Sequence, residues 1–279
     1  MLNEKLIATF KAFAAFCERE SLSYYMAYGS AIGTVRHKGM IPWDDDIDVF
    51  MPMPDFKRFI GMTAPEGYEI AHLKEEGINY PFTYGKFCDL SSTVWEQRKY
   101  PALLGVFVDV FPLYPVPYEK AHELRVEYTK RLVAYKRGMR RHSLSAWMNA
   151  GLHDKLAAIQ DLLYYRHICR RSKRRLLEYD AFVQKLSGDA YIIYDNFSGD
   201  EKVLYRGELF DGPALYGDFE GIKVLLPCGN DALLRQIYGD YMTPPPVEKR
   251  ASWHHHYFMD LNRRLTLAEA KAAVRKEGR

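Results

Sequence analysis

The stretch of this chain best suited to chemistry is "YGSAIGTVRHKGMIPWDDDIDVFMPM", residues 28–53. A turn of small residues, Gly29-Ser30, is followed by a basic patch and then by an apolar run typical of a buried strand. Between the patch and the run stand four carboxylates in five positions: Asp44, Asp45, Asp46 and Asp48. So much negative charge beside a buried strand needs a physical reason.

Alternation along a strand predicts that Asp46 and Asp48 share one face while Ile47 enters the core. Asp44 joins that face if the strand begins early, and Asp45 should point away. Two such carboxylates, about 6–7 Å apart, repel each other and favour protonation of one unless a cation is present. Mg²⁺, with Mn²⁺ as the alternative, supplies that charge and keeps positions for substrate phosphate. A solvated acidic turn is the competing interpretation, which the continuing hydrophobic strand disfavours.

Another acid stands in a second hydrophobic run, "GVFVDVFPLY". Asp109 lies there among valines and phenylalanines, where a carboxylate is costly to bury unless it is paired, hydrogen-bonded or bound to metal. A structural, hydrogen-bonded aspartate is the alternative. The chain thus carries a Gly-Ser turn, then Asp-x-Asp in a strand, then Asp in a later strand.

This order resembles the nucleotidyltransferase superfamily, whose fold DNA polymerase beta shares. More narrowly, "GTVRHKGMIPWDDDIDVFMP" (33–52) resembles the signature of the LicD family, bacterial phosphocholine transferases related to fukutin and fukutin-related protein. Further similar motifs are "VDVFPL" (108–113), "FEG" (219–221) and "YGDYMTPPP" (238–246) with the histidines after it. The resemblance spans most of the chain and is weakest over 118–187.

The resemblance implies Mg-dependent transfer of a phospho-alcohol, typically phosphocholine from CDP-choline, to a sugar hydroxyl of a surface glycan such as lipopolysaccharide or teichoic acid. CMP is released. It implies that Asp46 and Asp48 hold the metal, with Asp44 as a further ligand. Asp109 either completes the metal site or accepts the proton of the acceptor hydroxyl. The alternatives are a nucleotidyltransferase that moves an NMP from an NTP, and an inactive glycan-binding scaffold, which the retained acids disfavour.

Residues around the acids are candidates for substrate binding. Gly29 and Ser30 form a turn whose backbone N–H groups can approach a phosphate, although an ordinary helix cap has the same sequence. Trp43 and Tyr28 are able to stack on cytosine or to hold choline by cation–π contact. Most aromatic residues of this kind serve only in the core.

Cationic candidates complete the expected site. Arg36, Lys38 and, more weakly, Lys86 can neutralise a diphosphate or an anionic glycan, and a solvated loop is the alternative. The resemblance places a histidine near the triplet 254–256, and we name His255 as a substrate contact. Three adjacent histidines do not suit a single zinc ion, whose ligands are normally spaced.

Composition sets the remaining bounds. The chain has 279 residues, 48% of them hydrophobic and 14% aromatic, with a net charge of +3. No apolar run is long enough to span a membrane, and near-neutral charge without a basic-aromatic module disfavours nucleic acid. Scattered cysteines indicate free thiols and a cytoplasmic protein. The basic run "RHICRRSKRRL" (166–176) is either a solvated helix face or a peripheral contact with the inner face of the cell membrane.

Periodicity and turn residues predict the elements. A helix is expected to residue 20, a short strand before Gly29, a helix through "AIGTVRH", and a hairpin of "FTYGKFCDL" with "TVWEQ". The remaining elements are a strand "DIDVFM", a helix "PDFKRFIGM", a strand over 105–111 cut off by Pro112, Pro115 and Pro117, helices over 118–187, short strands at "YIIYD" and "ALYGDFEGIKVLLP", and helices "NDALLRQIYGDYM" and "TLAEAKAAVRK".

The expected fold class is α+β. It combines a nucleotidyltransferase (DNA polymerase beta-like) core built on a short mixed sheet with a helical insertion and a C-terminal elaboration. We expect a catalytic core over 1–117, a mainly helical segment over 118–190, and an α/β elaboration over 191–279 that packs on the core.

Overall fold

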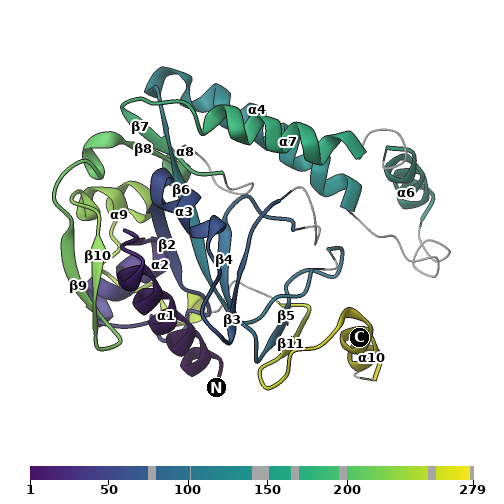
Figure 1. The fold of residues 1–279 in the computed structure, drawn as a ribbon, viewed down its shortest axis with the longest axis horizontal. Helices are drawn as coiled ribbons and strands as arrows, with labels where there is room; N and C mark the ends of the chain where they lie inside the picture. Colours follow the sequence, from purple (N-terminus) through teal and green to yellow (C-terminus); the bar gives the residue numbers. More distant parts are fainter. Residues whose placement is uncertain are drawn as a thin grey trace.

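A mixed seven-stranded sheet forms the centre of the computed structural model, which describes residues 1–74, 80–100, 102–139, 151–164, 170–194, 200–250 and 256–276 (Figure 1). Its strands are β1 (Tyr25–Met26), β2 (Asp48–Pro52), β3 (Tyr68–Ala71), β4 (Gly85–Asp89), β6 (Phe107–Val116), β7 (Ala190–Ile192) and β8 (Leu204–Arg206). The order is β1-β2-β6-β4-β3, and β7 pairs with both β6 and β8. Only the pair β2–β6 is parallel among these pairs.

Two small antiparallel pairs lie outside this sheet. They are β9 (Leu215–Phe219) with β10 (Ile222–Leu226), and β5 (Thr93–Trp95) with β11 (Phe258–Asp260). The helices are α1 (Leu2–Arg19), α2 (Tyr28–Ile32), the π-helical turn η1 (Gly33–His37), α3 (Met53–Gly61), α4 (Tyr118–Met139), α6 (Leu152–Tyr164), α7 (Arg170–Val183), α8 (Asp200–Val203), α9 (Asn230–Tyr238), α10 (Leu267–Lys276) and the 3₁₀ turns η3 (Gly207–Leu209) and η4 (Val247–Lys249). Among the residues described, no helix has both the length and the hydropathy of a membrane span.

Alternate residues of β2 face opposite sides of the sheet, as the two-residue period of a strand requires. Val49 and Met51 enter the core on the side that α1 and α3 cover, whereas Phe50 packs with Phe111 of β6 in a second cluster that includes α9. Asp48 stands two residues before Phe50. Its side chain therefore lies on the same side of the sheet as α9.

Most expected elements are confirmed. The helix at the N-terminus buries Leu6, Phe10, Phe13 and Cys17 at helical spacing, and "PDFKRFIGM" lies largely in α3. The turn in "GDFEG" joins β9 to β10. The mixture of strands and helices is confirmed as well, while the DNA polymerase beta-like arrangement stays an expectation.

Two strand predictions were wrong. The expected hairpin of residues 82–97 does not form, because β4 pairs with β3 and β6 while β5 pairs with β11. Pro112 and Pro115 also fail to end β6, which continues to Val116, directly before Pro117. Pro112 lies beyond Val110, where the pairing with β4 ends, and before Tyr114, where the pairing with β7 begins, so its missing N–H removes no bond on that edge.

A part-buried acid connects the helical segment to the sheet. In α7, Asp180 accepts hydrogen bonds from the hydroxyls of Tyr114 in β6 (2.5 Å) and Tyr128 in α4 (2.9 Å). α4 and α7 lie side by side above the sheet (Figure 1). The hydrogen-bonded Asp180 thus joins both helices to the strand that carries Asp109.

Candidate active site

Two buried carboxylates stand side by side where two parallel strands begin. Asp48 and Asp109 are direct register partners in β2 and β6, and only 9% and 7% of their surfaces are exposed. The backbone N–H of Asp48 donates to Oγ of Ser30 (2.9 Å), and that of Asp109 donates to the carbonyl of Ile47 (2.9 Å). Neighbouring strands lie about 4.8 Å apart, so the two acids are close.

The loop that leads into β2 carries three more acids. Carboxylate oxygens of Asp44, Asp45 and Asp46 lie within 4.8 Å of one another. The prediction that Asp45 points away was wrong, because β2 begins only at Asp48 and strand alternation does not apply to the residues before it. Ile47 is fully buried, as predicted.

Crowding of these charges disturbs their protonation. Burial, followed by the charge of Asp46 and a hydrogen bond to it, raises the pKa of Asp44 from 3.8 to about 7. Burial and the charges of Asp46, Asp109 and Asp44 raise the pKa of Asp48 well above its ordinary value. The negative charges of these carboxylates are not fully compensated within the protein. Carboxylate oxygens are hard donors, so the group suits a hard divalent cation.

Lys86 provides the main positive charge among these carboxylates. It is fully buried in β4 opposite Asp109, and its Nζ lies 2.6 Å from Oδ1 of Asp109 and 3.5 Å from Oε2 of Glu96. The ammonium also lies 3.3 Å from the ring centre of Phe107. The expected cation at this position is therefore engaged with the acid of β6.

The Gly-Ser turn lies directly against the acidic loop. A Cβ on Gly29 would stand 2.5 Å from Oδ2 of Asp44, so only glycine allows this approach. Tyr28 before it has a φ of 46°, a left-handed conformation that is unfavourable for a large side chain. Its hydroxyl is bonded to Tyr205 and to the carbonyl of Lys202, and its ring packs on Phe50, so much of Tyr28 serves the core.

A cationic wall stands beside the acidic loop. Arg36 donates from Nη1 to the carbonyl of Tyr241, and burial, followed by the charge of Arg250, lowers its pKa. The guanidinium of Arg250 lies 4.8 Å from the ring centre of Trp43, and His37 meets the same ring edge-on. Trp43 immediately precedes Asp44, which brings cationic side chains next to the metal-binding candidates.

The hairpin β9–β10 braces the same loop. Oε1 of Glu220 accepts the N–H of Met40 (2.9 Å), and the carbonyl of Lys38 accepts the N–H of Glu220 (3.1 Å). The "FEG" motif thus has a structural reason. The side chain of Lys38 is exposed. A hydrogen bond from Lys223 lowers the pKa of Asp218 on the hairpin, and the charge of Lys38 lowers it by a smaller amount.

Sequence reasoning missed several neighbours of the acids. Tyr238 at the end of α9 is one of them, since partial removal from solvent and the charge of Asp48 raise its pKa. Arg250 and Glu96 are others. The "YGDYMTPPP" motif begins at Tyr238 and marked its region, whereas no pattern marked Arg250. His255 lies outside the described residues.

Comparison with known proteins agrees with this arrangement. Residues 21–140 match the family described as "LicD/FKTN/FKRP, nucleotidyltransferase domain". This part of the chain is a LicD-family domain, and the resemblance seen in the signature is confirmed.

Similarity to one curated protein extends much further. Over 254 residues, the chain is 29% identical to the lipopolysaccharide cholinephosphotransferase LicD of Haemophilus influenzae, which covers 87% of this chain and 90% of that protein. A shorter match to an uncharacterized protein of Rickettsia typhi has 34% identity over 59 residues, 20% of this chain and 19% of the other.

Proposed function

We propose that this chain transfers phosphocholine from CDP-choline to a sugar hydroxyl of a lipopolysaccharide-type glycan and releases CMP. The observation that carries the proposal is the pairing of Asp48 with Asp109 beside the acidic loop of residues 44–46. The name of the Haemophilus relative supports both the phosphotransferase class and the type of acceptor.

Mg²⁺, with Mn²⁺ as the alternative, is the cofactor that this donor set suits. Asp44, Asp46 and Asp48 would hold it, and Asp45 lies close enough to contribute an oxygen. When bound, the ion supplies positive charge that offsets the charge of the diphosphate during transfer. Support comes from the all-oxygen ligands and from the raised pKa values of Asp44 and Asp48.

The chain's own residues account for the rest of the reaction. A bond forms between the acceptor oxygen and the phosphorus of phosphocholine, while the bond from that phosphorus to the bridging oxygen breaks, and the oxygen leaves with CMP. Asp109, positioned by Lys86, either accepts the hydroxyl proton or completes the metal site. Asp109→Asn distinguishes these roles, because loss of a ligand would lower Mg²⁺ affinity strongly, whereas loss of a base would lower kcat far more than Mg²⁺ affinity.

Substrate contacts follow from the wall beside the acids. We propose that Arg36 and Arg250 neutralise the diphosphate and that Gly29-Ser30 offers backbone N–H groups to it. The face of Trp43, which already attracts the guanidinium of Arg250, is suited to a choline cation. We further propose a cytoplasmic protein with peripheral membrane contact, since a nucleotide donor and a lipid-bearing acceptor meet at that boundary.

A nucleotidyltransferase is the second candidate, and the match to a family of nucleotidyltransferase domains favours it. The test is to incubate the protein and Mg²⁺ with lipopolysaccharide and either CDP-choline or CTP, and to measure CMP and pyrophosphate. Choline transfer with CMP release, absent in Asp48→Asn, is the expected result. Release of pyrophosphate from CTP would show nucleotidyl transfer instead of the proposed reaction. If neither CMP nor pyrophosphate is released, the inactive scaffold is the remaining interpretation.

A further inference from the structure

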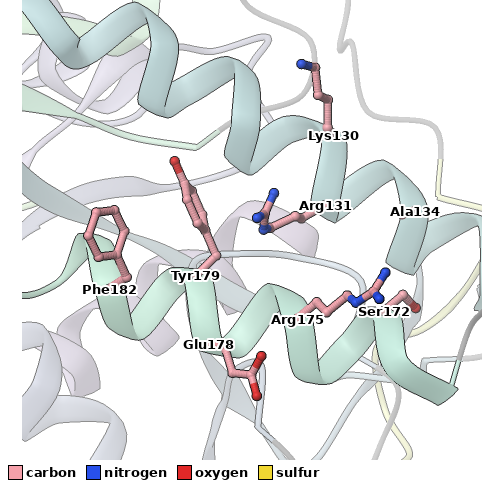
Figure 2. Close-up of a pocket in the computed structure, with 8 residues that line it drawn as sticks. All are labelled: Lys130, Arg131, Ala134, Ser172, Arg175, Glu178, Tyr179 and Phe182. Carbon is pink, nitrogen blue, oxygen red and sulfur yellow. The ribbon is translucent and has the colours of Figure 1, made fainter.

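A cavity of about 510 Å³ lies between α4 and α7, on the helical segment and apart from the carboxylates described above (Figure 2). Its lining combines cationic, aromatic and small residues, which are Lys130, Arg131, Ala134, Ser172, Arg175, Glu178, Tyr179 and Phe182. The proposed reaction uses none of them. Figure 2 shows Arg131 of α4 facing Tyr179 of α7 between the two helices, while Lys130 extends away from α7.

The charges of the cavity are unbalanced. Its one acid, Glu178, is already paired with Arg174 (2.8 Å), and Lys130 and Arg131 both pair with Glu127. The guanidinium of Arg131 also lies 4.4 Å from the ring centre of Tyr179. Arg175 makes no ion pair with any residue that the structure describes. The cavity therefore offers an anion more positive charge than the protein compensates.

The position of α7 increases this excess. Basic residues crowd its first turns, and no acid lies in the first turn, although the positive end of the helix dipole favours acids there. Such crowding is unfavourable within the protein alone. An external anion close to these side chains would offset it.

An apolar stripe is exposed on the neighbouring helix. Leu152, Leu156 and Ile159 of α6 share a face by their spacing of four and three residues, and their surfaces are 75%, 53% and 43% exposed. α6 contacts α4, and Phe182 beside the cavity is also 49% exposed. Apolar side chains next to cationic ones are the chemistry of a helix that lies in the surface of a bilayer.

We propose that α4, α6 and α7 form a docking surface for an anionic lipid bilayer. The cavity of Lys130, Arg131 and Arg175 receives a lipid phosphate, while Leu152 and Leu156 enter the outer acyl region. This inference deepens the proposed function and rests on it for the choice of a lipid-bearing acceptor. The bilayer contact itself requires neither donor nor catalysis.

Flotation with lipid vesicles tests the surface directly. The full chain is mixed with vesicles of phosphatidylcholine alone or with an equal part of phosphatidylglycerol, and the fraction that floats is measured. The double variant Lys130→Glu/Arg175→Glu removes cavity charge, Leu156→Gln weakens the stripe, and Lys271→Glu on α10 is the control for an exposed charge reversal. Circular dichroism and choline transfer to a soluble acceptor confirm that the variants fold.

Wild type and Lys271→Glu are expected to bind the anionic vesicles and not the neutral ones. The double variant should lose at least about 25-fold in affinity, at roughly fivefold for each basic charge lost, and Leu156→Gln a smaller factor. Equal binding of wild type and double variant, or equal binding of both lipids, would overturn the proposal. Binding of a soluble anionic polysaccharide without vesicles would assign the cavity to the glycan instead. Failure of choline transfer with intact flotation would reject only the proposed reaction.

Discussion

Lys86 Nζ lies 2.6 Å from Oδ1 of Asp109, and the two residues face each other across β4 and β6. A fully buried ammonium requires such a partner, because an unpaired charge in the interior is strongly unfavourable. The pair fixes the carboxylate that the proposed chemistry uses. Lys86 is therefore a positioning residue, a role that its expected contact with phosphate did not foresee.

Replacement of Lys86 tests this role. Lys86→Met removes the ammonium that pairs with the buried Asp109 and should lower the free energy of unfolding by about 3–5 kcal/mol, measured in urea. The double variant Lys86→Met/Asp109→Asn should recover much of that stability and remain inactive. Lys271→Met is the matched exposed control. A double variant as unstable as the single one would show that Lys86 stabilises by other contacts.

The pKa of Asp44, raised from 3.8 to about 7, predicts a pH dependence. The folded state binds this proton more tightly than the unfolded state, so the contribution of Asp44 to stability is complete below pH 3.8. It is lost as the pH rises through about 7. Thermal unfolding of metal-free protein should show this loss, and Asp44→Asn should remove it.

Mg²⁺ should have the opposite dependence. A cation binds the ionised carboxylates, so its affinity increases with pH over the same window and binding releases protons. The shift of the unfolding temperature by Mg²⁺ should be larger at about pH 8 than at about pH 5. A shift that is independent of pH would mean that Asp44 is not among the ligands.

Gly29 allows a sharp steric test. A methyl group in Gly29→Ala would meet Oδ2 of Asp44 at 2.5 Å and displace the carboxylate. We expect a loss of kcat/KM of up to about 100-fold, as for other small displacements in an active site. Gly61→Ala is the control, because no atom lies within 4 Å of its added Cβ. Full activity of Gly29→Ala would show that the position of the Asp44 carboxylate does not matter for activity.

Arg36 and Lys38 were predicted together, and the structure separates them. Arg36 is part-buried beside Arg250 and Trp43, whereas Lys38 is exposed near the hairpin. Arg36→Met should raise the KM for CDP-choline about tenfold or more, with kcat less affected and Arg36→Lys intermediate. Lys38→Met should change it about twofold or less. The reverse ranking would place the diphosphate toward Lys38.

The acids were predictable because local patterns mark them. Asp109 is conspicuous in a hydrophobic strand, and the apolar run predicts β2, although the strand was expected from Asp46 and begins at Asp48. Their exact pairing required the register of β2 with β6, which no local pattern contains. The misplaced Asp45 shows the limit of strand alternation at a strand's first residue.

Long-range partners explain what the sequence did not reveal. β4 and β5 are adjacent in sequence and looked like a hairpin, yet each pairs with strands elsewhere in the chain. Arg250 reaches Trp43 from a position more than 200 residues away, and nothing in its surroundings marks it. Such contacts depend on the tertiary fold rather than on propensity.

The bracing of the signature loop by Glu220 and Tyr241 has a consequence for synthesis of the protein. Asp48 and Asp109 leave the ribosome well before the groups that hold Met40 and Arg36, which stand at residues 220 and 241. A nascent chain would therefore expose an incomplete acidic loop for most of its translation. The proposed donor site would therefore be complete only after residues 220 and 241 have been synthesised.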